Sequence, residues 1–297
     1  MFKRVLVGVD LRQGGRDAIA LAQTLADPDA SLTLVYVSPG RLTRSHAVTA
    51  RLLAEDRARG ERELERERGE AGVDAELVVT QGASAGRVLH EQAEQRSADL
   101  IVLGSCSRGV FGRAMLGDDT RSAVNGAPCA VAVAPTGYAQ NRKALERIGV
   151  GYDGSRESEA ALAVARELAA PTHAVIRAEH IVGLPTYAYG AIGPAVLANL
   201  DAAVENAEKR MQELEGVQGH ADYGLSSEDL ADFSEEVDLL VVGSRGYGPW
   251  GRLVHGSTSS RLARHTRGPL LIVPRGTRPE PGESEQDVAA DQAAVPA

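Results

Sequence analysis

The sequence predicts an α/β protein built from two tandem domains, each an open, doubly wound parallel sheet with helices on both faces. Two observations support this fold class. A set of short segments occurs twice along the chain in the same order. Within each repeat, short continuous runs of valine, isoleucine and leucine alternate with helical patterns, which is typical of parallel strands covered on both sides by helices. A length of 297 residues also fits two domains of ordinary size.

The internal repeat is visible at four places. VLVGVD at 5–10 matches IGVGYD at 148–153, and ADLIVLGS at 98–105 matches VDLLVVGS at 237–244. FGRAMLG at 111–117 matches WGRLVHG at 250–256, and APCAVAVAP at 127–135 matches GPLLIVPRG at 268–276. Because the order is kept, we predict a duplicated domain, with repeat one at 1–138 and repeat two at 144–276. The remaining segment, 277–297, is rich in acidic and small residues and is predicted to be a disordered acidic tail.

The elements of repeat two follow from these patterns. Its predicted strands are IGVGY at 148–152, AVIRAEHIV at 174–182, VDLLVVG at 237–243 and PLLIV at 269–273. One helix follows from an apolar stripe with spacings of three and four residues, formed by Leu197, Leu200, Val204, Ala207, Met211 and Leu214. Its counterpart, EDRARGERELERERGE at 55–70, predicts a long solvated helix with i,i+4 ion pairs. Glycine-bearing turns follow the first and fourth strands, and they face one crevice if those strands are neighbours.

Composition and charge exclude several classes of function. The formal net charge of −9 argues against nucleic acid or an anionic membrane surface as a partner. No apolar run is long enough to span a bilayer, and the amino-terminal segment lacks the features of a signal peptide, so we expect a cytoplasmic protein. The two cysteines, Cys106 and Cys129, form no CxxC pair and give no zinc or redox motif. We expect Cys129 to be buried and inert.

A glycine-rich loop after the fourth strand of repeat two is the strongest functional motif. Two residues separate Gly243 from Gly246, and nine separate Gly246 from Gly256, which Ser257 follows at the start of a predicted helix. Glycines let the backbone approach a ligand closely. A helix amino terminus with outward-pointing N–H groups attracts anions, most often phosphate. The loop therefore predicts a phosphate site.

Two arginines of the same loop, Arg245 and Arg252, would add positive charge to this site. The loop also contains GYGPWG, but a dinucleotide fingerprint belongs after the first strand of a unit and needs an acid about 20 residues later. Here the segment follows the fourth strand, the later stretch PLLIVPRG has no acid, and GxxxxGK[ST] is missing. The phosphate site therefore belongs to neither the dinucleotide-binding class nor the P-loop class.

The pattern G-x2-G-x9-G-[ST] after DLLVVGSRG, together with the early aspartate in VGYDGS, resembles the universal stress protein family. The resemblance covers both repeats. It implies a five-stranded parallel sheet in each repeat, ATP in the crevice of the sheet, and phosphates on the loop at 243–258. It also implies that the tandem domains pair through their last strands, here AVAVA and LLIV, within one chain. A homodimer of the whole chain is left open.

For the ligand, the resemblance implies that Asp153 and its neighbours lie near the adenosine and any Mg²⁺, and that Ile181 contacts adenine. The nucleotide-binding residues that it implies are Gly151, Tyr152, Asp153, Gly154, Ser155, Ile181, Gly243, Ser244, Arg245, Gly246, Arg252, Gly256, Ser257 and Thr258, with Asp153 as the metal ligand. Plainer interpretations stay open for single residues. Asp153 could cap the helix that follows, and His180 and His255 could be structural.

Repeat one departs from this pattern in its own loop. Gly104 and Gly117 keep the overall spacing, but Ser107 replaces the second glycine, and Asp118 followed by Asp119 replaces the Ser-Thr pair. A carboxylate about 5 Å from a phosphate costs about 3 kcal/mol at an effective dielectric constant of about 20, or about a hundredfold in affinity. We therefore predict that repeat one binds ATP weakly or not at all, while repeat two binds it.

The function that follows is an ATP-binding module for stress response or signalling, with repeat two as nucleotide sensor and repeat one as scaffold. The sequence supplies no Ser–His–Asp order, metal-ligand cluster or acid pair, so no enzyme activity beyond slow ATP hydrolysis is expected. The alternatives are a weak Mg²⁺-dependent ATPase, a nucleotide-free dimerisation scaffold, and a site for another adenylate such as a cyclic nucleotide.

Overall fold

The computed structural model describes residues 1–10, 13–39, 46–105, 122–183, 194–244, 262 and 266–274. The elements of repeat one are β1 (Phe2–Gly8), α1 (Gln13–Leu25), β2 (Ala26–Pro39), α2 (His46–Ala71), β3 (Ala75–Gly82), α3 (Ala85–Arg96), β4 (Leu100–Gly104) and β5 (Ala130–Ala134). Those of repeat two are β6 (Arg147–Gly151), α5 (Arg156–Ala169), β7 (Val175–Gly183), α6 (Pro194–Gln212), β8 (Val217–Gly224), α7 (Ser226–Phe233), β9 (Leu239–Gly243) and β10 (Leu270–Val273). All four strands predicted for repeat two are present.

The strands form one sheet in the order β3-β2-β1-β4-β5-β10-β9-β6-β7-β8. Within each repeat, all neighbouring strands are parallel, which confirms the predicted fold class. β1 lies beside β4, and β6 lies beside β9, so the strand order reverses next to the first strand of each repeat. The ends of the first and fourth strands therefore lie side by side at the carboxyl edge of each half-sheet, where open α/β sheets bind ligands.

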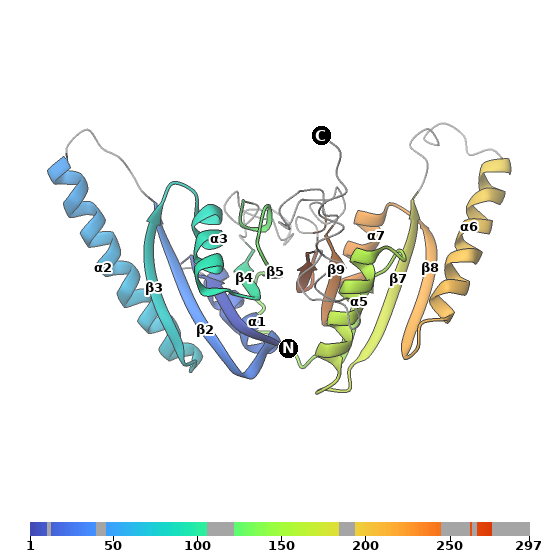
Figure 1. The fold of residues 1–297 in the computed structure, drawn as a ribbon, viewed down its shortest axis with the longest axis horizontal. Coiled ribbons are helices and arrows are strands. Elements are labelled where there is room, and N and C mark those ends of the chain that lie inside the picture. Colours follow the sequence, from blue (N-terminus) through green and yellow to red (C-terminus); the bar gives the residue numbers. More distant parts are fainter. Residues whose placement is uncertain are drawn as a thin grey trace, which may run out of the picture.

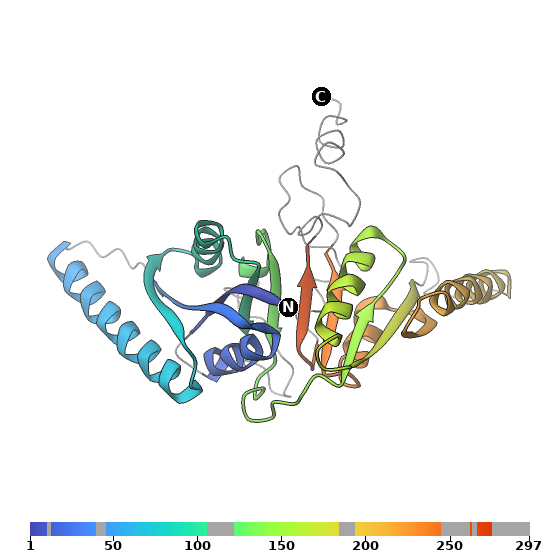
Figure 2. The same ribbon diagram turned by 60° about the horizontal axis from the view of Figure 1, so that its bottom comes forward.

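The two half-sheets join through their last strands, the contact that the family resemblance implies. β5 and β10 pair antiparallel, with Leu271 opposite Ala132. Figures 1 and 2 show the half-sheets meeting in the middle of the molecule, with α2 and α6 at its two ends. Every residue of both strands is buried. The junction is therefore part of an apolar core rather than a loose contact between domains.

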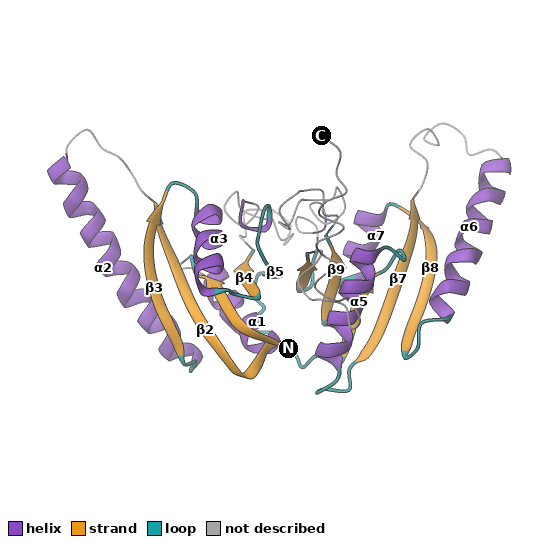
Figure 3. Ribbon diagram, in the orientation of Figure 1, coloured by secondary structure: helices purple, strands orange, loops and turns teal. Residues whose placement is uncertain are grey.

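Helices cover both faces of the sheet (Figure 3). One face carries α1, α2, α5 and α6 over a core that includes Leu21, Leu64 and Met211. The other face carries α3 and α7 over a core that includes Leu89 and Phe233. Each core runs through both repeats, so the repeats form one hydrophobic unit. In the described ranges, none of these helices combines the length and the apolar character that a membrane span needs.

The charged helix of repeat one is α2, and it has ion pairs of the predicted spacing. Arg51 pairs with Glu55 at 2.8 Å, and Arg57 pairs with Glu61 at 3.0 Å, both between Nε and a carboxylate oxygen. One side of the helix is packed rather than solvated, because Leu64 is fully buried in the core. A single leucine among charges gave no apolar stripe, so the sequence did not predict this packed side.

The apolar stripe of repeat two lies on α6, where Leu200, Ala207 and Met211 are buried. The helix ends at Gln212, so the last predicted stripe residue, Leu214, lies just beyond it. This stripe packs against β8: a Cβ on Gly219 would lie 2.6 Å from the Cβ of Met211. The periodicity therefore correctly predicted which side of the helix faces the sheet.

Candidate functional site

Three segments of repeat two meet at the carboxyl edge of the sheet, where the sequence predicts a crevice. They are the turn from β6 to α5, the end of β7 and the end of β9, and β6 lies between β7 and β9. They bring together the predicted site residues Gly151, Tyr152, Asp153, Gly154, Ser155, Ile181, Gly243 and Ser244. The remaining predicted site residues lie outside the described residues: Arg245, Gly246, Arg252, Gly256, Ser257 and Thr258.

The turn after β6 is organised by Asp153 and Ser155. Ser155 is the N-cap of α5, because its Oγ accepts a hydrogen bond from the Ser158 amide at 3.3 Å. The Oδ1 atom of Asp153 accepts bonds from the Ser155 amide at 3.1 Å and from the Ser155 hydroxyl at 2.5 Å. Gly154 has a φ of +76°, which glycine adopts without strain. Ser155 therefore supplies the helix cap considered for Asp153, and the exposed Asp153 holds that cap in place.

Gly243 has a packing role that the sequence did not predict. A Cβ at this position would lie 2.4 Å from the carbonyl oxygen of Glu157, in the first turn of α5. Gly104 meets the same constraint in repeat one, where a Cβ would lie 1.9 Å from the carbonyl oxygen of Gly14. In both repeats this glycine lets the first helix start directly against the end of the fourth strand.

Tyr152 points into the protein core, away from the edge of the sheet. Its side chain is 8% exposed and belongs to the core beneath α1 and α5. Its phenolic O–H donates to the Glu159 carboxylate in the first turn of α5. Burial and the bond to Glu159 raise the pKa of Tyr152 to about 12, so the phenol stays protonated and remains a donor at neutral pH. Glu159 was not among the predicted site residues, and no sequence motif marked it.

Two neighbouring residues of β7 serve different faces of the sheet. Ile181 packs against the core beneath α3 and α7, and its carbonyl oxygen accepts a bond from the Ser226 hydroxyl at 3.5 Å. His180 is half-buried, and burial lowers its pKa; the positive charge of Arg210 acts in the same direction, while Asp153 opposes it. The imidazole is therefore neutral at pH 7.

Ser244 is the most unusual polar residue at this edge. Its side chain is fully buried, and its Oγ has no hydrogen-bond partner in the part of the chain that the structure describes. Its counterpart in repeat one is Ser105, also buried, whose hydroxyl bonds to Thr136 Oγ1 at 3.2 Å. Aligning the ends of the repeats would have revealed the contrast, because Thr136 follows AVAVAP whereas Arg275 follows LLIVP.

The charges around the turn limit what the edge can bind. Glu157 and Glu159 lie in the first turn of α5, where they oppose an anion at that helix terminus. Asp153 offers one exposed carboxylate, the ligand type that Mg²⁺ prefers. Across the described residues, no group of three or more His, Cys, Asp or Glu side chains is arranged to hold a metal ion. Among the described residues, Asp153 therefore lacks the neighbouring carboxylate, imidazole or thiol groups that would complete a metal site.

The fold and its edge define a class of protein: a tandem α/β protein in which two five-stranded, doubly wound units share one sheet, each with a strand order that reverses next to its first strand. The model of the universal stress protein family matches residues 1–135 and 144–274. Both halves are matched, and the chain therefore belongs to the universal stress protein family.

Relatives with curated descriptions are mycobacterial. Universal stress protein Rv2005c from Mycobacterium tuberculosis is 30% identical over 186 residues, which cover 59% of this chain and 61% of that protein. A universal stress protein from Mycolicibacterium smegmatis is 25% identical over 187 residues, covering 60% of this chain and 62% of that protein. The matches therefore span less than two thirds of the length of these relatives.

Solved structures show the same fold over nearly the whole chain. A universal stress protein from Archaeoglobus fulgidus has a TM-score of 0.66 at 18% identity, covering 92% of this chain and 98% of that one. Protein PA1789 from Pseudomonas aeruginosa, described as functionally unknown, has a TM-score of 0.58 at 16% identity and covers 93% and 94% of the two chains. At these identities the likeness concerns the fold alone.

Proposed function

We propose that this universal stress protein binds ATP and acts as a nucleotide-dependent module in stress response or signalling. ATP occupies the crevice of repeat two, domain 144–276, whereas domain 1–138 binds it weakly or not at all. The tail at 277–297 takes no part. The observation that carries the proposal is the buried hydroxyl of Ser244, which nothing in the described part of the chain satisfies.

A buried hydroxyl without a partner costs about 1–3 kcal/mol, so each such group calls for an explanation. Ser244 directly follows β9 and opens the glycine-rich loop, so a ligand oxygen in the crevice could accept its hydrogen bond. In repeat one the equivalent hydroxyl of Ser105 is already bonded to Thr136. This contrast supports a ligand in repeat two and none in repeat one.

The charges at the turn support one orientation of the nucleotide. The acidic first turn of α5 repels phosphates, so they would lie on the loop at 243–258, with Arg245 and Arg252. The adenosine would then lie toward the β6 turn and Ile181. Mg²⁺ would accompany the phosphates, with Asp153 as its protein ligand.

Calorimetric titration of the full chain with ATP and Mg²⁺ tests this proposal. Ser244→Ala should weaken ATP binding about tenfold, because a hydrogen bond to the ligand is lost. It should leave the ligand-free protein at least as stable as the wild type, because the lost hydroxyl is buried without a partner among the described residues. The matched variant Ser105→Ala should lose about 1 kcal/mol of stability with the bond to Thr136 and keep its ATP affinity.

Two outcomes would contradict the proposal. One is no heat of binding for the wild type at saturating ATP and Mg²⁺, which would favour a nucleotide-free scaffold. The other is an equal loss of affinity in Ser105→Ala and Ser244→Ala. Competition with a cyclic nucleotide in the same titration separates ATP from other adenylates.

A weak Mg²⁺-dependent ATPase is a second candidate, supported by the exposed carboxylate of Asp153 at the crevice edge. It predicts phosphate release above background that disappears in Asp153→Ala. A homodimer would need a surface other than β5 and β10, because these strands already pair with each other inside the chain. Sedimentation of the full chain distinguishes monomer from dimer.

A further inference from the structure

The turns that precede the first helix of each repeat can be matched residue by residue. The glycine that ends the fourth strand contacts Gly14 in repeat one and Glu157 in repeat two. With these two residues as the fixed point, Asp10 corresponds to Asp153. The residue before each aspartate is then Val9 in repeat one and a tyrosine in repeat two.

In repeat two, two hydrogen bonds tie this turn to α5, one on each side of Asp153. On the near side, the buried phenol of Tyr152 donates to Glu159. On the far side, the Ser155 hydroxyl accepts from the Ser158 amide at 3.3 Å. Asp153 lies between these anchors, so the direction of its carboxylate is set by both.

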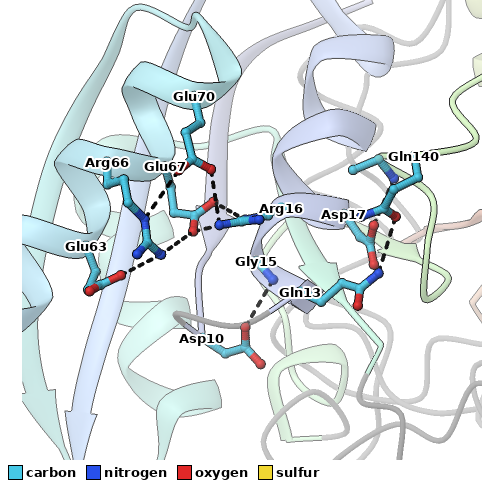
Figure 4. Close-up of polar contacts among 11 residues, drawn as sticks. Asp10, Gln13, Gly15, Arg16, Asp17, Glu63, Arg66, Glu67, Glu70 and Gln140 are labelled. Carbon is cyan, nitrogen blue, oxygen red and sulfur yellow. Dashed lines mark hydrogen bonds and ion pairs between the residues drawn. The ribbon is translucent and has the colours of Figure 1, made fainter.

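Repeat one lacks the first anchor. Val9 has no hydroxyl, and the residue that corresponds to the glutamate acceptor is Arg16. Figure 4 shows that Arg16 reaches α2 instead, with its Nε 3.0 Å from Glu67 and an Nη 3.1 Å from Glu70. Glu67 is only 2% exposed, so this ion pair fixes α1 to α2 rather than to the turn.

The second anchor also differs. In repeat one, Asp10 Oδ1 itself accepts the bond from the Gly15 amide at 3.0 Å (Figure 4). The carboxylate is therefore the helix cap. In repeat two, Ser155 performs this task, and the carboxylate of Asp153 instead accepts bonds from the amide and the hydroxyl of Ser155.

We propose that Tyr152 and Glu159 are positioning residues of the nucleotide site in repeat two: their bond fixes the turn so that Asp153 faces the bound nucleotide or its Mg²⁺. The inference rests on the proposed function. Neither side chain needs to touch the ligand, because the phenol lies in the core and Glu159 accepts its hydrogen bond.

The experiment is a set of calorimetric titrations of the full chain with ATP and Mg²⁺. Tyr152→Phe removes only the hydroxyl, and Glu159→Gln removes the charge of the acceptor on an exposed residue. Each should weaken ATP binding about fivefold, and the double variant should be no weaker than either single variant, because all three lose the same bond. Thermal unfolding of each variant without ligand shows whether it is folded.

The variant Asp153→Ala separates a positioning role of Tyr152 from a purely structural one. In the Asp153→Ala variant, adding Tyr152→Phe should not change ATP affinity further, because the carboxylate that Tyr152 positions is gone. An additional fivefold loss in that background would overturn the inference. The matched control is Arg16→Gln, which breaks the ion pair to Glu67 in repeat one and should leave ATP affinity unchanged.

The outcomes also separate this inference from the proposed function. If the wild type does not bind ATP, the proposed function fails. If the wild type binds ATP and both Tyr152→Phe and Glu159→Gln, folded, bind it equally well, only the inference fails.

Discussion

Repeat one uses its crevice aspartate to cap its own first helix, whereas repeat two gives that task to Ser155. Repeat one also bonds its buried serine to Thr136, whereas Ser244 in repeat two has no partner in the described residues. The sheets are nevertheless built in the same order. A duplicated α/β unit can therefore keep its fold while the hydrogen bonds at the edge of its sheet change. The polar groups of the edge are not needed to form the sheet, so they are free to diverge.

The repeats differ again where the chain passes from one to the other. Asp17 on α1 is fully buried and accepts bonds from the amides of Gly137 and Ala139 in the connecting segment, both at 2.8 Å. Thr24 of α1 also holds this segment, because it accepts a bond from the Tyr138 hydroxyl at 3.2 Å. The equivalent helix of repeat two has Ala160 in place of the aspartate. Repeat one thus anchors the connection, and its buried Ser105 is already bonded to Thr136.

The largest expected effect comes from giving repeat two the acid of repeat one. Ser257→Asp should weaken ATP binding about a hundredfold, because a carboxylate would face the phosphates at close range. Calorimetry of the full chain measures the change. Ser257→Asn is the matched control of the same size without charge, and it should keep most of the affinity. If the asparagine variant bound as weakly as the aspartate variant, charge would not explain the difference between the repeats.

Substituting the glycines that end the fourth strands tests a feature that the two repeats share, the close approach of the first helix to the end of the fourth strand. Gly104→Ala and Gly243→Ala should each destabilise the protein by about 1–3 kcal/mol, because the new methyl group meets the backbone in the first turn of the first helix of the same repeat. Urea unfolding measures this loss. The control is Gly69→Ala on α2, where a Cβ meets nothing within 4 Å and helix propensity should add up to about 1 kcal/mol. Loss of ATP binding in Gly243→Ala at unchanged stability would instead assign this glycine to the ligand.

Individual strands could be predicted from the sequence only where their residues are apolar enough to be buried. β6, β7, β9 and β10 were predicted because their runs are apolar enough to be buried on both faces. β8 was not predicted from its residues, because VQGHADYG is an edge strand with most side chains exposed and has no apolar pattern. The pairing of β5 with β10 came from the family resemblance. An apolar run in the sequence indicates that a strand is buried, but it does not indicate which strand lies beside it.

The candidate site was predictable only in part for a similar reason. The spacing of the loop glycines and the position of Asp153 are local properties of the sequence, and they could be read directly. The bonding of Ser105 depends on a hydroxyl 31 residues away that the fold brings to 3.2 Å. The packing of Gly243 likewise depends on where α5 begins. Whether a polar group is satisfied is a property of tertiary contacts, so residue spacing did not reveal it.

A smaller effect concerns the pH dependence of stability that Asp17 contributes at the connecting segment. Burial raises the pKa of Asp17, with Asp10 adding to the shift and the two amides opposing it. The folded protein therefore binds this proton more tightly than the unfolded chain. The stability of the wild type relative to Asp17→Asn should rise as the pH falls through the raised pKa toward the ordinary value of 3.8. Urea unfolding of both proteins across this range measures the difference, and parallel pH profiles would contradict it.

The smallest expected effect concerns the start of the last strand of each repeat. When the two half-sheets are aligned by strand register, Cys129 of repeat one is equivalent to Gly268 of repeat two. A Cβ on Gly268 would lie 2.3 Å from the carbonyl oxygen of Ser234, so only repeat one has room for a side chain. Cys129 is 4% exposed, and burial raises its pKa to about 12. At about pH 8 roughly one thiol in ten thousand would be ionised, and the thiolate is the reactive form.

In the variant Cys106→Ser, where Cys129 is the sole thiol, a disulfide reagent should therefore label the folded protein hardly at all and label it fully in urea. ATP should not change the rate, because this strand belongs to repeat one, where we expect ATP to bind weakly or not at all. Labelling of the folded protein as fast as in urea would mean that the junction between β5 and β10 opens readily. The two repeats would then behave as separable domains rather than as halves of one core.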